Sequence, residues 1–587
     1  MHEVYPQERW NLKDVLPTHK GPAFEKIQQE LETNINTFLS HKKDLQPAIT
    51  WETLHTIIKI LETIELTAGN IGAYGSLWTS MNTNNQEARA FKDKIQTYLT
   101  QQENKLLFFN LWIKQLDEKN AQRLIQQAGP YAYFLERIRK AAPHTLSEKE
   151  EQLINIKDTT GTHALINLYD LITDNFTYPL TINKKTTTYT REQLTAFVHH
   201  PDANLRKQAY QTIQKKYETH QDVLGEIYKN VVGDWTSESI QLRNYPTSIS
   251  PRHLNNDISN EAIQAMLNSC KKHVDLFKDY FTTKSKQLKL KTLSRYDLYA
   301  PVTAKNKTYT WKEGVTLVLD AYEQFSPELA NHARKIFKAH HVDAVVQQGK
   351  RGGAFCYDIS PAITPYVLLS YTGKERDVMT LAHELGHGVH DLLTHKHSCL
   401  MNHPPLILAE TASIFGEMII TDKLLNETND QQRQAILANK LDDFYASIQR
   451  QAYFVLYEQE AHEAIQQGAT ISELNSIYLK NLQEQFGKQA IPQDFQYEWL
   501  SIPHIYHTPF YCYAYSFGNL LTLALYQMYK EQGKSFVPAY LKFLSHGGST
   551  TPKAIGKELN IDFEDPHFWN QGFATIKTMI QQFKKTR

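Results

Sequence analysis

The sequence of 587 residues contains only four cysteines, and no two of them are spaced as CxxC. So few cysteines exclude a disulfide scaffold, and we expect reduced, mostly buried thiols in a cytosolic protein. Lysine plus arginine equals aspartate plus glutamate, at 63 residues each. This balance indicates neither a basic nucleic-acid surface nor an acidic tail, so nucleic acid is not an expected partner.

Long apolar runs are also missing. A membrane-spanning helix needs about 18 or more consecutive apolar residues, and the longest stretch, near residues 520–525, is much shorter. The first ten residues lack the basic and apolar segments of an export signal. We therefore expect a cytoplasmic protein that contacts no membrane, and nothing in the sequence indicates an obligate protein partner.

What the sequence does contain is helical periodicity, with apolar residues at i, i+3, i+4 and i+7. It predicts a mainly helical fold with helices over residues 22–43, 51–66, 86–117, 202–240, 260–290, 312–340, 376–394, 406–426, 432–467 and 509–531. Segments 353–359 and 364–371 predict a small β insertion. The weakly periodic, threonine-rich stretch near residue 185 marks the predicted boundary between an N-terminal helical lobe (1–185) and a larger lobe (186–587).

One predicted helix carries the motif His383-Glu384-Leu-Gly-His387, which is HExxH. On an α-helix, positions i and i+4 lie about 40° apart around the axis and one turn apart along it. Two histidines at this spacing can bind one zinc ion. Glu384 is rotated by about 100° from His383, so it can lie beside the metal without being a ligand.

Two glycines, Gly386 and Gly388, interrupt the same helix. Each glycine costs about 1 kcal/mol in a helix interior. We therefore expect another backbone or a ligand to approach closely there.

The third zinc ligand must come from elsewhere, because residues 390 and 393 do not fit the metzincin pattern. Glu410 and Glu417 are the only charged residues of the apolar stretch 406–421, and they lie two helical turns apart. A carboxylate among apolar neighbours is costly unless it is paired or binds metal. We interpret Glu410 as the ligand and Glu417 as a carboxylate that orients a ligand histidine. The reverse assignment stays open on this reasoning.

Further histidines follow the motif. His390 lies close to one turn past His387. It is a candidate for contacting a ligand residue on the side away from the metal. His395, His397 and His403 are expected to face solvent from a loop.

The motif and its surroundings resemble the M3 metallopeptidases, most closely the oligoendopeptidase F branch. The similarity spans essentially the whole chain. Its main stretches are Arg9–Leu12, Lys350–Phe355, His383–His390, Ala409–Glu417 and His504–Tyr515. The resemblance implies a mostly helical, two-lobed, neurolysin-like zincin with one zinc ion at the floor of a deep channel. It also implies cleavage of short peptides at internal bonds.

The resemblance also implies roles for individual residues. It favours Glu410 over Glu417 as the zinc ligand. It implies that His504 and several tyrosines contact the substrate carbonyl and stabilise the tetrahedral intermediate. The tyrosines align in more than one way; Tyr511 and Tyr515 are spaced i, i+4 on a predicted helix whose first turn holds Pro509, so we choose these two. Tyr506 and Tyr513 are then candidate substrate-binding residues.

The mechanism expected from these residues is hydrolysis by a zinc-activated water. Glu384 would act as general base and then pass the proton to the leaving amine. Gly352, Gly353 and Ala354 precede a predicted strand, whose edge would bind extended peptide through main-chain hydrogen bonds. An ordinary hairpin turn would also explain the two glycines.

Two other interpretations compete. Glu384 and His387 also form an ExxH pair, as in di-iron helical proteins, but the other ExxH matches, at residues 52–55 and 564–567, suit a bundle poorly. A non-catalytic, zinc-stabilised peptide-binding protein is the second alternative, although a structural zinc site does not need Glu384.

Overall fold

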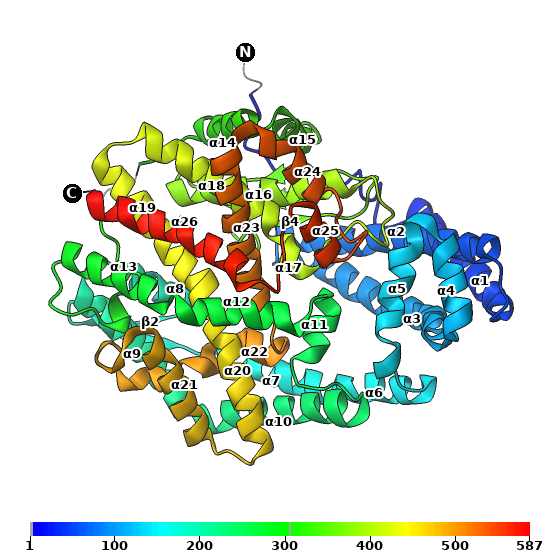
Figure 1. The fold of residues 1–587 in the computed structure, drawn as a ribbon, viewed down its shortest axis with the longest axis horizontal. Coiled ribbons are helices and arrows are strands. Elements are labelled where there is room, and N and C mark those ends of the chain that lie inside the picture. Colours follow the sequence, from blue (N-terminus) through cyan, green and yellow to red (C-terminus); the bar gives the residue numbers. More distant parts are fainter. Residues whose placement is uncertain (1–3, 304–306, 587) are drawn as a thin grey trace. The chain divides into compact units, whose positions relative to one another are not determined.

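The computed structural model describes residues 4–303 and 307–586 (Figure 1). Most of these residues are helical, and the described strands form two small sheets. The predicted mainly helical fold with a small β insertion is confirmed. Across the described ranges, we find no helix with the length and apolar character needed to cross a membrane. Residues 1–3, part of the stretch inspected for an export signal, lie outside the described residues.

The chain forms two compact units, each assembled from three separate segments. Unit 1 comprises Met1–Ala142, Lys307–Asn426 and Met528–Ile561, and unit 2 comprises Pro143–Asn306, Glu427–Gln527 and Asp562–Arg587. The boundary predicted at residue 185 falls inside unit 2. The predicted lobes, 1–185 and 186–587, are continuous in the sequence, whereas each compact unit combines three separate segments. The predicted division stays a prediction.

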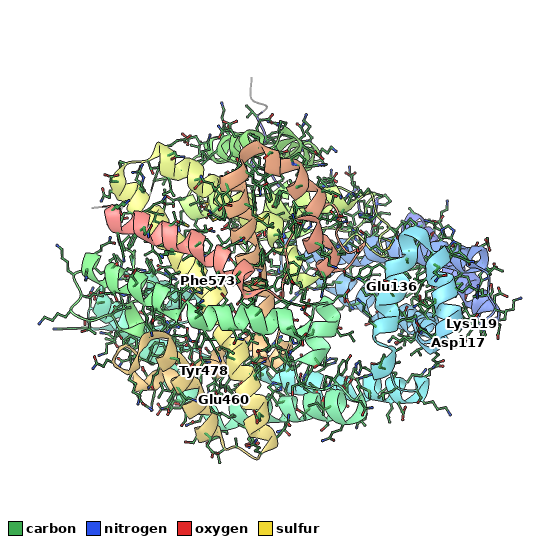
Figure 2. The ribbon with its side chains drawn as sticks, in the orientation of Figure 1. Asp117, Lys119, Glu136, Glu460, Tyr478 and Phe573 are labelled. Atoms are coloured by element: carbon green, nitrogen blue, oxygen red, sulfur yellow. The ribbon has the colours of Figure 1, made fainter. Side chains whose placement is uncertain are left out.

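Unit 1 contains the N-terminal helices and the helix with the HExxH motif. Its helices are α1 (Pro22–Ser40), α2 (Trp51–Met81), α3 (Gln86–Gln115), α4 (Glu118–Gln127), α5 (Ala132–Lys140), α14 (Trp311–Phe325), α15 (Pro327–Lys338), α16 (Glu375–Thr394), α17 (Leu406–Ala409), α18 (Thr411–Glu427), α24 (Val537–Leu544) and α25 (Pro552–Glu558). Polar caps begin several of them: the side chains of Thr50, Asn85 and Asp117 (Asp117 is labelled in Figure 2) each accept a hydrogen bond from a backbone N–H in the first turn of α2, α3 and α4.

A three-stranded sheet in unit 1 has the order β3-β5-β4. Its strands are β3 (Val342–Asp343), β4 (Phe355–Tyr357) and β5 (Tyr366–Leu368). The central strand β5 is wholly buried and pairs in parallel with β3 and antiparallel with β4, with Cys356 opposite Val367. Among the described strands β4 is therefore an edge, as predicted for segment 353–359.

Unit 2 is also helical, with one hairpin. Its helices are α6 (Glu148–Thr160), α7 (Thr162–Asp174), α8 (Arg191–Thr195), α9 (Ala203–Thr219), α10 (Gln221–Thr236), α11 (Ser250–Asn256), α12 (Asn260–Lys272), α13 (Val274–Gln287), α19 (Asp430–Phe444), α20 (Arg450–Gln466), α21 (Ile471–Phe486), α22 (Pro503–His507), most of α23 (Tyr513–Gln532), and α26 (Pro566–Lys585). The threonine-rich stretch forms β1 (Tyr178–Ile182) and β2 (Lys185–Tyr189), joined by a turn at Asn183 and Lys184, both with positive φ.

A buried ion-pair network ties several of these helices together. Arg295 donates to Glu498 at 2.7 Å, and Arg450 donates to the same oxygen at 3.2 Å. Tyr478 of α21, labelled in Figure 2, donates to the other oxygen of Glu498 at 2.9 Å. A buried charge needs such partners, because an unpaired one would be costly.

Several predicted helices are interrupted in the structure. A π-helical segment, Tyr445–Gln449, separates α19 from α20, and His220 separates α9 from α10. The prediction that residues 509–531 form one helix is wrong at its start, because α23 begins at Tyr513 and Pro509 lies in a loop. Tyr511 therefore precedes the helix that carries Tyr515.

Candidate metal centre and active site

Helix α16 presents His383 and His387 on one face, as the motif predicts. Their Nε2 atoms lie 3.2 Å apart. The opposite, apolar face of the helix is fully buried through Val378, Leu381 and Leu385. Burial of that face fixes the helix in rotation, so both imidazoles point the same way.

Gly386 explains how a second helix reaches these histidines. A Cβ atom on Gly386 would lie 2.6 Å from the Cα atom of Ser413 in α18. Only a glycine allows the two backbones to approach this closely. At Gly388 an added Cβ would meet the side chain of Ile336 at 2.5 Å. The predicted close approach of another backbone is therefore found at Gly386.

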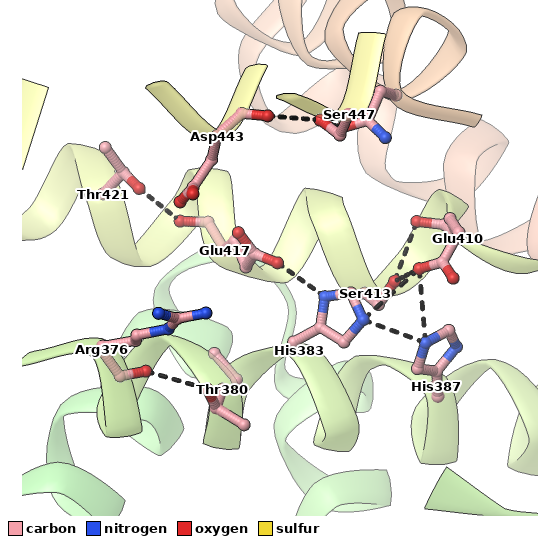
Figure 3. A network of polar contacts seen from close by, with 12 residues as sticks. Arg376, Thr380, His383, His387, Glu410, Ser413, Glu417, Thr421, Asp443 and Ser447 are labelled. Carbon is pink, nitrogen blue, oxygen red and sulfur yellow. Dashed lines mark hydrogen bonds and ion pairs between the residues drawn. The ribbon is translucent and has the colours of Figure 1, made fainter. Parts of the chain in front are cut away.

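Glu410 completes the group of candidate ligands. It sits between α17 and α18, where the predicted helix 406–426 is broken. Its Oε2 atom lies 3.4 Å from the Nε2 atoms of both His383 and His387, and Ser413 donates to the same oxygen at 2.8 Å. Figure 3 shows these three side chains facing one another.

Glu417 lies behind His383 rather than beside the other ligand atoms. The Nδ1 atom of His383 donates to Glu417 at 2.6 Å (Figure 3). A proton held on Nδ1 leaves the Nε2 lone pair directed at the site. The geometry therefore places Glu410 beside the Nε2 atoms and Glu417 beside Nδ1 of His383, as expected for a ligand and an orienting carboxylate.

In this site the histidine and glutamate side chains favour each other's charged forms. Burial disfavours the charged imidazole of His383, but the hydrogen bond and charge of Glu417 outweigh it and raise its pKa to about 9. Burial likewise opposes the charge of Glu410, yet the neighbouring histidines lower its pKa to about 2. Glu410 is thus an ionised carboxylate at neutral pH, which suits a metal ligand.

Glu384 faces the cavity in front of the histidines. This cavity has a volume of about 460 Å³ and is also lined by Ala354, Phe355, His383 and His387. The side chain of Glu384 is buried, and burial raises the pKa of its carboxyl group. A carboxyl with a raised pKa beside two candidate ligands is suited to accept a proton.

A second acidic group in this cavity was missed by sequence reasoning. Asp358 and Asp391 line it with Cys356, whose thiol donates to Asp391 at 3.7 Å. Burial and the charge of Asp358 raise the pKa of Asp391 well above its usual range. Asp358 follows strand β4 and Asp391 lies in helix α16, 33 residues later. Helix or strand periodicity does not relate two such positions, so only the fold shows that they are close.

The histidines after the motif are less exposed than expected. His395 donates to Asp358 at 3.0 Å, and His397 hydrogen-bonds the carbonyl of Ser545 at 2.8 Å. Both are half-buried, so they face solvent only in part. His403 is exposed, as predicted. His390 is buried against the backbone of Ala409 and Leu544, and burial lowers its pKa to about 4. It thus lies next to the residue that precedes Glu410.

Unit 2 holds the other predicted catalytic residues. His504 in α22, Tyr511 in the following loop and Tyr515 in α23 form one partly exposed cluster. The rings of His504 and Tyr511 are stacked with centroids 6.1 Å apart, and the Tyr515 hydroxyl lies 3.5 Å from Nε2 of His504. The two tyrosines chosen from the sequence, Tyr511 and Tyr515, therefore contact each other and lie near His504. They do not share a helical face, because Tyr511 precedes α23.

Tyr506 and Tyr513 differ from that cluster because both are fully buried. Tyr506 stacks on Tyr169 and donates to the carbonyl of Leu224 at 3.3 Å. Tyr513 donates to the carbonyl of Arg252 at 3.0 Å. Their substrate-binding role stays a prediction, and one that this geometry does not favour.

Gly352, Gly353 and Ala354 lie just before the edge strand β4. The two glycines are exposed, and Gly353 has φ 78°, which favours glycine. Ala354 lines the cavity with Glu384. The segment therefore leads from an exposed turn into the cavity that contains the candidate ligands.

Comparison with known proteins identifies the family. A family model described as "Peptidase family M3" matches residues 196–575, more than half of the chain. The chain belongs to peptidase family M3. A second model, described as "Oligopeptidase F", matches residues 112–178. The resemblance stated from the sequence motifs is confirmed, and the three candidate ligands lie within the M3 match.

Named relatives of this M3 chain cover nearly all of it. It is 26% identical over 592 residues to the oligopeptidase PepF of Bacillus subtilis, covering 96% of this chain and 85% of that one. It is also 26% identical to an oligoendopeptidase F homolog of Borreliella burgdorferi, covering 99% and 98%. The crystal structure of oligoendopeptidase F from Enterococcus faecium has the same fold, with a TM-score of 0.72, 19% identity and coverage of 96% and 98%.

Proposed function

We propose that this M3-family chain is a zinc-dependent endopeptidase that hydrolyses internal bonds of short peptides. The observation that carries the proposal is the convergence of His383, His387 and Glu410 within 3.4 Å of one another, with Glu384 in the same cavity. The names of the relatives, oligopeptidase and oligoendopeptidase, support the same substrate class.

The three candidate ligands fit one zinc ion. Zinc bound tetrahedrally at about 2.0–2.1 Å has ligand atoms about 3.3–3.4 Å apart. The separations here are 3.2 Å between the two Nε2 atoms and 3.4 Å from each to Oε2 of Glu410. Two imidazoles and one carboxylate are also a typical ligand set of a catalytic zinc site, which keeps one position open.

Glu384 is the proposed general base. When bound, zinc would supply a Lewis acid that polarises the scissile carbonyl and lowers the pKa of a water towards about 7. The Glu384 carboxylate would accept the proton of the attacking water and hold it on one of its oxygens. It would then donate that proton to the nitrogen of the leaving amine.

The remaining residues would orient the reacting groups. Glu417 holds His383 with its Nε2 lone pair directed at the site. His504, Tyr511 and Tyr515 would donate hydrogen bonds to the oxygen of the scissile carbonyl as negative charge develops there. Among the described strands β4 has one unpaired edge. This edge would pair with the main chain of an extended peptide and would so allow peptides of varied sequence to bind.

The test is cleavage of an internally quenched peptide of about ten residues, measured before chelation, after chelation and after zinc is restored. We expect loss and recovery of internal cleavage, while circular dichroism shows a folded protein throughout. Unfolding on chelation, or no cleavage of a varied peptide pool by the zinc-loaded protein, would contradict the proposal and favour a zinc-stabilised peptide-binding protein.

A further inference from the structure

The loop that carries Tyr511 contains a strained residue. Pro509 disfavours helical backbone at the preceding Thr508, whose φ of −151° ends α22. Phe510 then adopts φ 59°, a left-handed conformation that is costly for a residue with a side chain. Such a conformation persists only where the surroundings hold it in place.

The peptide group between Pro509 and Phe510 is held at both ends. Arg252 of α11 donates to the carbonyl oxygen of Pro509 through Nε at 3.2 Å and Nη2 at 3.1 Å. Glu458 of α20 accepts a hydrogen bond from the N–H of Phe510 at 2.7 Å. The two side chains match the peptide dipole, because a guanidinium donates to the oxygen and a carboxyl oxygen accepts from the N–H. Hydrogen bonds to charged groups are the strong ones in proteins.

The hydrogen bond to Phe510 is the main polar interaction described for Glu458. Its side chain is fully buried, and among the described residues its second oxygen, Oε2, has no hydrogen-bond partner. Burial raises its pKa to about 8, even though the Phe510 N–H and Arg252 favour the charged form. Burying a carboxylate in this way costs free energy that a purely apolar residue would not cost. The contact that Glu458 makes is with the loop.

The held peptide group sets the position of the next residue. Directly after Phe510, the N–H of Tyr511 donates to the carbonyl of Thr508 at 3.1 Å, which closes a tight turn. This turn brings the Tyr511 ring over His504 and edge-on to Tyr515, with centroids 5.2 Å apart. The ring of His462, one helical turn from Glu458, contacts Phe510 with centroids 4.6 Å apart.

We propose that Arg252 and Glu458 are positioning residues, which hold the Pro509–Phe510 peptide group so that Tyr511 stays stacked on His504 for the reaction. This inference rests on the proposed peptidase function. It assigns to two ionisable side chains from helices distant in the sequence, the partly buried Arg252 and the buried Glu458, a role in turnover rather than in stability alone.

The first test compares two replacements of Glu458. Glu458→Gln keeps an oxygen that accepts from Phe510, whereas Glu458→Met keeps the length of the side chain and removes the acceptor. We expect Glu458→Met to lower kcat about tenfold with KM changed less than about threefold, and Glu458→Gln to stay within about threefold of wild type in both. Should Glu458→Met fail to fold, Arg252→Met tests the other end of the peptide group.

The second test separates positioning from general stability. In a Tyr511→Phe background, Glu458→Met should lower kcat less than about twofold further, because its effect passes through the Tyr511 hydroxyl. Tyr280→Phe is the matched control: it removes a buried hydroxyl of unit 2 that donates to Asp442 at 2.7 Å and to the carbonyl of Ala438 at 3.0 Å. It should leave kcat within about twofold of wild type.

A third measurement does not depend on activity. Amide hydrogen exchange of the segment 505–515 should speed up in Glu458→Met and not in Glu458→Gln. Unchanged kcat in Glu458→Met, full additivity with Tyr511→Phe, or an equal loss of kcat in Tyr280→Phe would each overturn the inference. If the wild-type protein cleaves no peptide, the proposed function fails, and unchanged exchange in Glu458→Met would then overturn the inference separately.

Discussion

His383 and His387 meet across one turn of a continuous helix, whereas Tyr511 meets His504 because the chain reverses at Phe510. In unit 1 helical geometry and one glycine arrange the candidate ligand atoms. A hydrogen bond that His383 donates to Glu417 and one that Ser413 donates to Glu410 complete the arrangement. In unit 2 the cluster depends on a left-handed residue that contacts from α11 and α20 hold in place. Local helical structure therefore places the two histidines, and one packed helix, with the residue just before it, supplies the two glutamates. The aromatic cluster depends instead on contacts from two other helices.

The largest effect should come from Glu384→Gln, which changes proton transfer and leaves the helix intact. General acid–base catalysis contributes about 10²–10⁴-fold, so we expect a loss of about 10³-fold or more in kcat. Metal analysis should still find one zinc per chain, since Glu384 is not among the candidate ligands. A variant that retains a tenth of the wild-type activity would contradict the general-base role.

The next effect tests whether the aromatic cluster takes part in the reaction at all. Tyr511→Phe and Tyr515→Phe should each lower kcat by about 10²-fold, as expected for loss of a hydrogen bond made in the transition state. The matched controls are Tyr506→Phe and Tyr513→Phe, which remove buried hydroxyls from the same segment. If steady-state kinetics give equal losses in all four variants, the distinction between exposed and buried tyrosines is wrong.

A third experiment examines the local construction of the metal site. Glu417→Ala should weaken zinc binding by about 10–100-fold, because outer carboxylates orient ligand histidines without binding the metal. Glu410→Ala should weaken it much further, since a ligand is lost. Zinc competition with a chromogenic chelator measures both constants. The opposite ranking would restore the alternative assignment of the two glutamates.

The smallest effect concerns the pH dependence of stability in unit 2. Burial lowers the pKa of His462 to about 3, whereas an unfolded chain has a value near 6.5. The unfolded state therefore binds the proton first, so this histidine costs stability as the pH falls below about 6.5. Between pH 7 and pH 5 the wild type should lose about 2 kcal/mol relative to His462→Leu in denaturant titrations. Parallel pH profiles of the two proteins would show that His462 is not buried as described.

The two regions also differ in how well the sequence predicted them. The HExxH helix, its buried apolar face and the pair Glu410 and Glu417 follow from spacings within one or two helical turns. The edge strand near Cys356 was predicted from a short run of strand-forming residues. In each case the residues that the prediction groups together lie close in the sequence, although the contact of Glu417 with His383 joins residues 34 apart.

Prediction failed where contacts between residues far apart in the sequence determine the backbone conformation. Residues 509–512 have helical spacing, but Glu458 and Arg252, 52 and 257 residues away from their partners, stabilise a reversal at Phe510 instead. The cavity pair Asp358 and Asp391 is likewise invisible in the sequence. The two compact units could not be derived either, because the chain passes between them several times.

The contact at Gly386 has a consequence for protein design. Because a Cβ atom there would overlap the backbone of α18, the five-residue motif works only together with the helix that it touches. A transplanted HExxH sequence would bring two histidines and a carboxylate to a new scaffold but not the Glu410 and Glu417 oxygens. The smallest portable form of this centre is a pair of helices packed against each other at a glycine, with the residue just before the second helix included.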